Sequence, residues 1–211
     1  MKKQKSILLI IITLIMTLLV LTGCASSPKG SVTLVPGENM LDNGNFDAGQ
    51  DPWTPWIDEG WGGAGEVIWA DGIAKLVIDD PGTAPWAVAM HYKKLLIEKG
   101  EKYVFSFKMK SDENRVIRTG IGNGLVPTDP PYLYYQEVEI TTEWQTYTFE
   151  FKMPFRTDKF GRIDFNCALN TGEFLPEGSP WTQDQLKATS SATVYIDDVE
   201  LRKMVPESAA E

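Results

Sequence analysis

The feature that most constrains the fold is a strict alternation of apolar and polar residues within several short segments. Between residues 103 and 110, the odd positions carry Tyr103, Phe105, Phe107 and Met109, whereas the even positions after Val104 carry serine and lysine. The segment 146–151 repeats the pattern. Because successive side chains of a strand point to opposite faces, each segment is predicted to be a strand with one buried face.

Other short segments are rich in β-branched and aromatic residues and are separated by glycine, proline and asparagine. They predict strands at 66–69, 73–78, 87–92, 115–121, 134–140, 162–168 and 192–202. No segment after residue 23 shows a sustained helical pattern. The expected fold is all-β, an antiparallel two-sheet β-sandwich of the jelly-roll type over residues 32–204, followed by a flexible tail at 205–211.

The N-terminal segment has the pattern of a secretory signal. Three lysines precede an apolar run at 7–20, which ends in Leu21-Thr22-Gly23-Cys24. The run is short for a membrane span, which favours a cleaved lipoprotein signal peptide at 1–23 over a plain transmembrane anchor. Cys24 would carry the lipid and residues 24–31 the tether. The folded part is therefore expected outside the cytoplasm, lipid-anchored to the bacterial cell membrane or outer membrane.

Charge and cysteine content narrow the function further. The chain has 20 basic and 29 acidic residues; without the three signal lysines the balance is 17 − 29 = −12. This balance argues against nucleic-acid binding. If Cys24 is lipidated, Cys167 has no partner for an intrachain disulfide, and it is expected to be a small buried hydrophobe. With His91 as the one histidine, a cysteine nucleophile is not expected.

Strand parity predicts which polar side chains share the outer face of one sheet. In 162–168, Ile163, Phe165 and Cys167 take the inner parity, which leaves Asp164 and Asn166 outside. The same test places Ala87 and Ala89 outside on the strand 87–92. The predicted groove residues are His91, Arg118, Tyr135, Glu137, Asp164 and Asn166. The alternative is an ordinary solvated sheet face.

Five collinear motifs support a family resemblance. The first, Asn39-Met40-Leu41-Asp42-Asn43-Gly44-Asn45-Phe46-Asp47, precedes Trp53 and Trp56, and the others lie at 81–86, 100–110, 141–147 and 194–201. Together they resemble carbohydrate-binding modules of families 4 and 9, with families 16 and 22 as relatives. The resemblance implies that the first motif is the opening strand of a jelly roll that binds soluble or amorphous glycan chains in a cleft on one sheet.

The resemblance also implies a structural calcium. It points to Asp47 at the first strand and to Asp197 or Asp198 near the last strand, since the two chain ends lie side by side in a jelly roll. Calcium is bound by several carboxylate and carbonyl oxygens, and here it would hold the chain ends together without taking part in chemistry. A neighbouring glycoside hydrolase is an expected partner of such a module.

Tryptophans are the expected sugar-stacking residues, because the apolar faces of sugar rings pack on flat aromatic rings. Trp56 and Trp61 flank a loop-like, glycine-containing stretch and are predicted to contact ligand. Trp53, Trp69 and Trp144 are expected in the core or at a sheet edge. Trp86 shares the parity of Val88, and this favours a place in the core unless the position of Trp86 at the strand start moves the side chain to the rim. Trp86 is also a candidate carbohydrate-binding residue.

Catalysis is not expected. The chain has no compact acidic motif of a jelly-roll glucanase, no Ser-His-Asp pattern and no metal-binding histidine pair, so no catalytic cofactor is implied either. Ala87 and Ala89 depart from the resemblance, because related modules usually carry polar groups there. The sequence thus predicts a non-catalytic, membrane-anchored protein that binds polysaccharide of the β-glucan or xylan type. The alternative is a structural or protein-binding sandwich of the cell envelope.

Overall fold

The structure, a computed structural model, describes residues 32–125, 131–168 and 191–209; the side chains of Tyr134 and Tyr135 also lie outside the description. The chain divides into the units Met1–Thr33 and Leu34–Glu211. All described strands and the hydrophobic core belong to Leu34–Glu211. This unit therefore has what a domain needs to fold independently.

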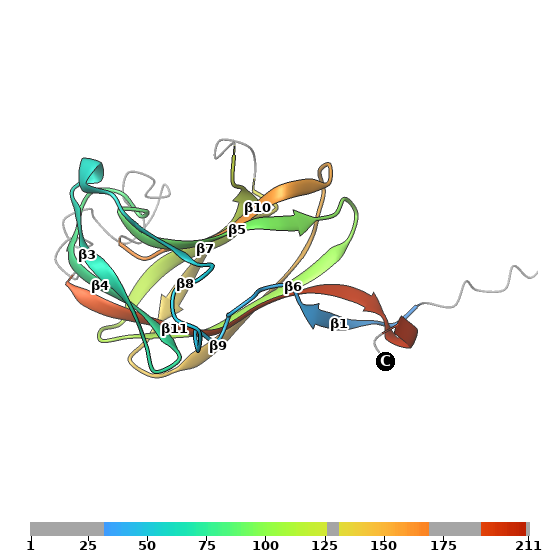
Figure 1. Ribbon diagram of the computed structural model, residues 1–211, viewed down its shortest axis with the longest axis horizontal. Helices are drawn as coiled ribbons and strands as arrows, with labels where there is room; N and C mark the ends of the chain where they lie inside the picture. Colours follow the sequence, from blue (N-terminus) through green and yellow to red (C-terminus); the bar gives the residue numbers. More distant parts are fainter. Residues whose placement is uncertain (1–31, 126–130, 169–190, 210–211) are drawn as a thin grey trace, which may run out of the picture. The chain divides into compact units, whose positions relative to one another are not determined.

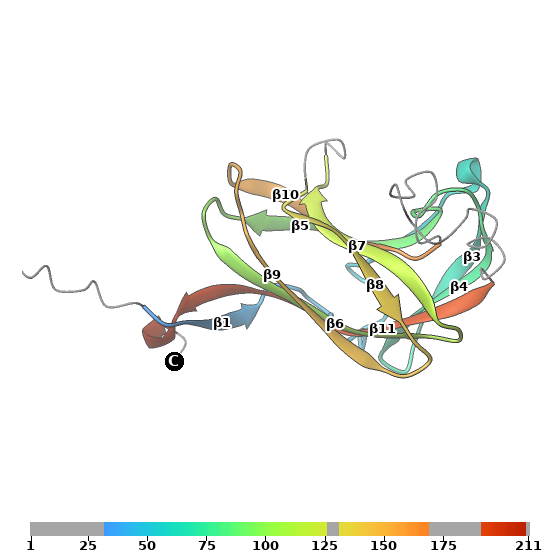
Figure 2. The same ribbon diagram turned by 180° about the vertical axis from the view of Figure 1, so that it is seen from behind.

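Eleven described strands form two antiparallel sheets (Figures 1 and 2). The six-stranded sheet has the order β3-β4-β11-β6-β9, and β1 also pairs with β11. Its strands are β1 (Leu34–Asn39), β3 (Gly63–Ala70), β4 (Ile73–Pro81), β6 (Lys102–Ser111), β9 (Gln145–Lys152) and β11 (Ala192–Pro206).

The five-stranded sheet has the order β2-β5-β10-β7-β8. Its strands are β2 (Thr54–Ile57), β5 (Val88–Ile97), β7 (Arg115–Asn123), β8 (Leu133–Ile140) and β10 (Asp158–Asn166). Two short 3-10 turns complete the described elements, η1 (Glu59–Trp61) and η3 (Glu207–Ala209). The predicted all-β sandwich is confirmed, since the described residues form two antiparallel layers and no α-helix.

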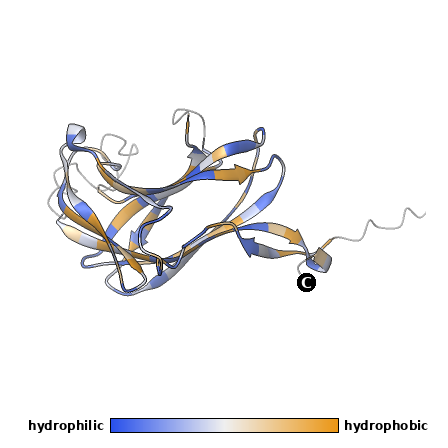
Figure 3. Ribbon diagram, in the orientation of Figure 1, coloured by the Kyte–Doolittle hydropathy of each residue, from blue (hydrophilic) through white to orange (hydrophobic). Residues whose placement is uncertain are grey.

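Aromatic side chains fill the space between the layers. Phe105 and Phe107 of one sheet are fully buried and meet Phe165 of the other, with ring centroids 6.0 and 5.0 Å apart. Hydrophilic and hydrophobic residues alternate along the strands of both layers (Figure 3). The alternation that predicted β6 and β9 thus reflects one face turned to this core and one turned to water.

Several boundaries differ from the sequence prediction. Of the motif 39–47, expected to be an opening strand, only Asn39 lies in a strand, and turns occupy most of the rest. The strands β1 and β2 were not predicted, because they are short and carry no clear alternation. Residues 205 and 206, expected in the flexible tail, are paired instead: Val205 pairs with Val35 and Pro206 with Leu34, so both belong to β11.

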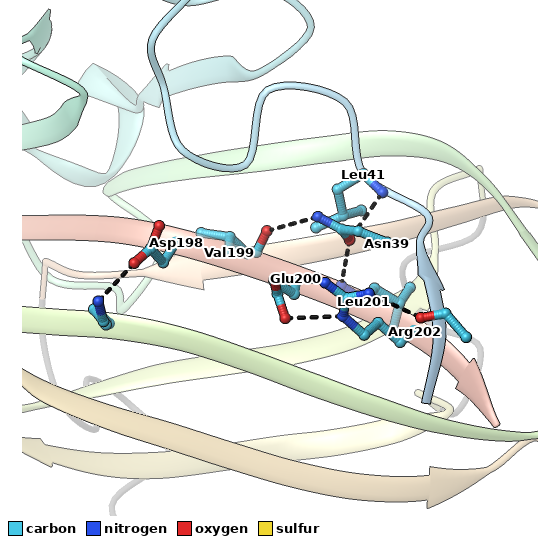
Figure 4. Close-up of polar contacts among 9 residues, drawn as sticks. Asn39, Leu41, Asp198, Val199, Glu200, Leu201 and Arg202 are labelled. Atoms are coloured by element: carbon cyan, nitrogen blue, oxygen red, sulfur yellow. Dashed lines mark hydrogen bonds and ion pairs between the residues drawn. The ribbon is translucent and has the colours of Figure 1, made fainter. Parts of the chain in front are cut away.

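Side-chain hydrogen bonds join β1 to β11 where the two strands leave the sandwich (Figure 4). The Asn39 side-chain oxygen accepts from the backbone N–H groups of Leu41 and Leu201, at 3.2 and 3.0 Å. Arg202 donates to the Gly37 carbonyl at 2.8 Å and forms two hydrogen bonds to Glu200, at 2.9 and 2.7 Å. The chain ends of the unit are thereby held side by side.

No helix within the described ranges is long and apolar enough to cross a membrane. The predicted signal peptide at 1–23, Cys24 and the tether at 24–31 lie outside the described residues.

Candidate functional site

One row of partner residues crosses the outer face of the five-stranded sheet. Trp56 lies opposite Ala89, Ala89 opposite Asn166, Asn166 opposite Arg118, and Arg118 opposite Glu137. Directly opposed residues of antiparallel strands point to the same face, so this row spans all five strands. Arg118 and Glu137 form an ion pair at 3.0 Å. The prediction that these polar residues share one face is confirmed by the register.

A second row lies beside the first. Thr54 is opposite His91, and His91 is opposite Asp164. His91 Nδ1 and Arg162 Nε approach the same carboxylate oxygen of Asp164, at 2.7 and 2.8 Å. Charge on the Asp164 carboxylate is therefore balanced by the Arg162 guanidinium within the sheet face.

The centre of this face is less exposed than predicted. His91, Asp164 and Asn166 are 5%, 3% and 5% exposed and so are buried, where strand parity had implied contact with water. Parity states which face a side chain is on, but exposure also depends on what covers that face. The exposed members of the first row are at its ends: Trp56 is 44% exposed, and the Glu137 side chain is 41% exposed. For Tyr135 only the backbone, in β8, is described.

The two alanines that departed from the family resemblance have different surroundings. Ala87 precedes β5 and belongs to the core cluster, so its predicted outward placement was wrong. Its backbone lies so close to Gly63 that a Cβ at Gly63 would be 2.3 Å from the Ala87 carbonyl oxygen. Ala89 does lie in the first row, but it is fully buried. The close approach of the two backbones therefore requires glycine at position 63.

Trp61 lies at the end of η1, on a loop beside the first row. The Asp58 side chain accepts from the Gly60 N–H at 3.1 Å, and the Trp61 carbonyl accepts from the Thr83 N–H at 2.9 Å. Trp61 is 40% exposed, and its ring meets that of Trp86 edge-on at 5.5 Å. Trp86 precedes β5 and is only partly buried. This matches the position at the rim of the sheet that the sequence left open for it. These two rings form an aromatic pair separate from Trp56.

Comparison with known proteins identifies the family. Residues 38–172 match a family described as a carbohydrate binding domain, which is more than half of the chain. The chain belongs to this family. Carbohydrate-binding domains are non-catalytic modules, so the prediction that this domain is not an enzyme is confirmed by its family. No curated protein matches the sequence.

Solved structures of carbohydrate-binding modules share the fold. A structure described as "CBM4 structure and function" is 27% identical, with a TM-score of 0.59, over 77% of this chain and 99% of that chain. The second N-terminal cellulose-binding domain of Cellulomonas fimi β-1,4-glucanase C is 19% identical, with a TM-score of 0.57, over 82% of this chain and 97% of that chain. The N-terminal cellulose-binding domain of the same enzyme has a TM-score of 0.53 at 18% identity, over 78% of this chain and 96% of that chain.

The first sequence motif of this carbohydrate-binding domain, residues 39–47, has a structural role. The Asn43 side chain donates to the carbonyls of Gly49 and Asp51 and accepts from the Ala48 N–H, at 2.8, 2.9 and 3.0 Å. Its backbone carbonyl accepts from the buried Trp53 indole at 3.0 Å. Asn43 therefore organises the turns that lead into β2, the strand that carries Trp56.

The remaining tryptophans divide between core and surface. Trp53 is 2% exposed and packs on Phe46 and Tyr92, which confirms its predicted place in the core. Trp69 is partly buried against the core. Trp144 is 39% exposed just before the edge strand β9, on the other sheet. It lines a shallow hollow of about 280 Å³ with Lys108, Gln145, Thr146 and Asp197.

The predicted calcium ligands are only partly brought together. Among the described residues, no three His, Cys, Asp or Glu side chains form a group that would hold a metal ion. Asp198 pairs with Lys108 at 2.7 Å. Burial raises the pKa of Asp197, and the carboxylates of Asp198 and Asp47 raise it further, against a backbone hydrogen bond from Asp198 and the charge of Lys108. Asp47 thus lies close enough to Asp197 to influence its pKa, and calcium binding at these carboxylates stays a prediction.

Cys167 is buried behind the first row, and burial raises the pKa of its thiol to about 12. The thiol is therefore protonated at neutral pH and has the expected role of a small core residue.

Proposed function

We propose that the domain binds neutral polysaccharide chains of the β-glucan or xylan type across the outer face of the five-stranded sheet. The observation that carries this proposal is the first row, in which a 44% exposed indole, Trp56, lies in line with amide, guanidinium and carboxylate groups. An indole offers a flat apolar surface for a sugar ring, and planar polar groups bind sugar hydroxyls.

The charge of the two rows favours a neutral ligand. Arg118 is paired with Glu137, and Arg162 is paired with Asp164. The positive and negative charges of these four residues cancel, so the two ion pairs offer no excess charge to a uronate or sulfate chain. The row crosses four inter-strand steps of about 4.8 Å, a width of about 19 Å, which accommodates several sugar rings.

The proposed sugar contacts lie at the edges of the face, because the exposed aromatic residues are there. Since His91, Asp164 and Asn166 are buried, we assign the direct stacking contacts to Trp56 and Trp61, with Trp86 positioning Trp61. Arg118 and Glu137 would bind hydroxyl groups at the opposite edge. The buried residues would support this surface without touching the sugar.

The test is affinity electrophoresis of the unit Leu34–Glu211 in gels containing xylan, mixed-linkage β-glucan, laminarin or amorphous cellulose. At least one polysaccharide is expected to retard the domain. Trp56→Ala and Trp61→Ala should each weaken the affinity by about tenfold, the loss of about 1.4 kcal/mol of stacking and burial. The control is Trp144→Ala, which removes a similarly exposed indole from the other sheet and should leave the retardation unchanged.

The burial of the central residues favours one alternative, a structural or protein-binding sandwich of the cell envelope without glycan affinity. If none of the four polysaccharides retards the domain, this alternative replaces the proposal.

We also propose that the protein is a lipoprotein carried by a diacylglyceryl group on Cys24 outside the cytoplasm, with a neighbouring glycoside hydrolase acting on the captured chains. The sequence pattern before Cys24 supports this part of the proposal.

A further inference from the structure

We propose that the end of the domain from which β1 emerges rests directly on the surface of an anionic phospholipid bilayer. The contact is formed by two neighbouring turns and the strand ends beside them, here called the basic turn surface. Its residues are Lys99, Lys152, Phe155, Arg156, Lys159 and Phe160. This inference goes beyond the lipid anchor, because it assigns membrane contact to the folded domain itself.

Hydrogen bonds bring the two turns together. The Lys99 N–H donates to the Thr157 hydroxyl at 3.0 Å, and the Gly100 N–H donates to the Met153 carbonyl at 2.9 Å. Lys102 and Lys152 are direct partners across β6 and β9. Residues from 99 to 102 and from 152 to 160 therefore form one continuous surface.

Cations on this surface are free to meet an anionic partner. All four basic side chains are exposed, and none of them has an ion-pair partner among the described residues. Three of the nearby acids are engaged: Glu98 and Glu101 pair with Lys203 at 2.7 and 3.6 Å, and buried Asp158 accepts hydrogen bonds from Asn123 and Tyr132. Exposed Glu150 is a fourth, and the exposed Lys102 offsets its charge. The surface is thus locally positive in a chain with a formal net charge of −9.

Exposed aromatic side chains lie among these cations. Phe155 is 40% exposed and Phe160 is 48% exposed. Exposed phenylalanines beside lysine and arginine are the combination that binds the boundary between headgroups and acyl chains, since the rings enter the apolar layer while the cations attract phosphate. A neutral glycan would use the rings but would leave the cations without a partner.

The position of the surface agrees with the place where the chain enters the domain. Lys203, which pairs with Glu98, directly precedes the part of β11 that pairs with Leu34–Pro36. The two turns lie at the end of the sandwich from which β1 extends, whereas η1 lies at the opposite end (Figures 1 and 2). Cys24 precedes Leu34 by ten residues, a reach of at most about 35 Å, so a lipid there would keep this end near the bilayer.

Overall negative charge does not prevent the contact. At physiological ionic strength, interactions between exposed charges are screened over about 8 Å. The anionic headgroups therefore interact mainly with the nearest charged side chains of the protein, and on the basic turn surface these are lysine and arginine.

The test is cosedimentation of the unlipidated unit Leu34–Glu211 with vesicles of phosphatidylglycerol and phosphatidylcholine, compared with phosphatidylcholine alone. Binding is expected only with phosphatidylglycerol and should weaken as salt is added. The double variant Lys99→Gln, Arg156→Gln should bind about 25-fold more weakly, about fivefold for each cation removed. Phe160→Ser should bind about tenfold more weakly.

Matched controls change the same charge or a comparable apolar group on the outer face of the six-stranded sheet. Lys75→Gln, Lys110→Gln and Ile68→Ser should bind like the unaltered unit. Circular dichroism of every variant reports folding, and the aromatic and the cation variants test the surface independently. The proposal is overturned if the unit does not bind phosphatidylglycerol vesicles, if the controls lose as much affinity as the turn variants, or if soluble dextran sulfate is bound and vesicles are not. Because the vesicle cosedimentation assays contain no polysaccharide, their outcomes are independent of polysaccharide binding.

Discussion

At the scale of single residues, the environment separates side chains that look alike in the sequence. Trp53 and Trp56 are three positions apart, yet the first is 2% exposed and the second is 44% exposed. The Trp53 indole donates to the Asn43 carbonyl and packs on Phe46, whereas Trp56 belongs to the outer face of β2. Many of the aromatic residues of the chain therefore fill the core and are not available to a sugar.

Asp197 provides the residue-scale prediction. If calcium binds at Asp47 and Asp197, adding calcium at about 100 times its Kd should stabilise the unit Leu34–Glu211 by about 2.7 kcal/mol. The physical reason is that a divalent cation compensates the unfavourable burial and the repulsion that raise the pKa of Asp197. The measurement is the melting temperature with calcium and with a chelator.

Asp197→Asn should remove most of this response. Asp79→Asn makes the same change of charge at an exposed position of β4 and should retain the response. An equal melting temperature with calcium and with chelator would show that these carboxylates bind no calcium.

At the scale of elements, the alternation of apolar and polar residues predicted the long strands well but did not predict the short strands β1 and β2. The segments expected at 103–110 and 146–151 lie within β6 and β9, because both strands have one face in the core and one in water. Parity also placed Arg118, Glu137, Asp164 and Asn166 on one face correctly. It did not predict which of them are exposed, because exposure depends on side chains from other strands.

The loop of Trp61 gives the element-scale prediction. Gly82 has φ = 63°, and a Cβ there would be 2.2 Å from the Trp61 carbonyl oxygen. Gly82→Ala should therefore displace η1 and weaken polysaccharide retardation, besides lowering the free energy of unfolding by about 2–4 kcal/mol. Urea denaturation and affinity electrophoresis measure the two effects.

Gly100→Ala is the matched control. Its φ is 82°, but no atom lies within 4 Å of the added Cβ, so it carries the backbone strain without the collision. It should lose only about 1 kcal/mol and keep its affinity for polysaccharide. Equal losses of stability and affinity in the two variants would mean that the contact between Gly82 and Trp61 does not position the loop.

At the scale of the whole domain, the two ends have different surfaces. The loop with Trp61 and Trp86 is at one end, and the basic turn surface is at the other (Figure 1). If the second end faces a bilayer, the aromatic pair points away from it, toward polysaccharide outside the cell. Binding and anchoring would then not compete for the same surface.

The whole-chain prediction concerns Cys24. In a bacterial host, the full chain should incorporate labelled palmitate and remain with the membrane fraction, whereas Cys24→Ser should incorporate none, because the thiol is the site of lipid attachment. Cys167→Ser, which changes the other cysteine, should still be labelled. Labelling of the Cys24→Ser variant would contradict the assignment of Cys24 as the lipidated residue.

The sequence alone determined the fold class, the family and the shared face of the polar row, because side-chain alternation and short turn motifs are local properties of the chain. Only the tertiary structure decided that Asn39 joins β1 to β11 and that Asn43 organises the turns before β2. It also decided that Ala87 lies against Gly63, and that His91, Asp164 and Asn166 are buried. It also brought together the segments 99–102 and 152–160. Exposure and proximity depend on strands far apart in the sequence, and no local pattern encodes which of them meet.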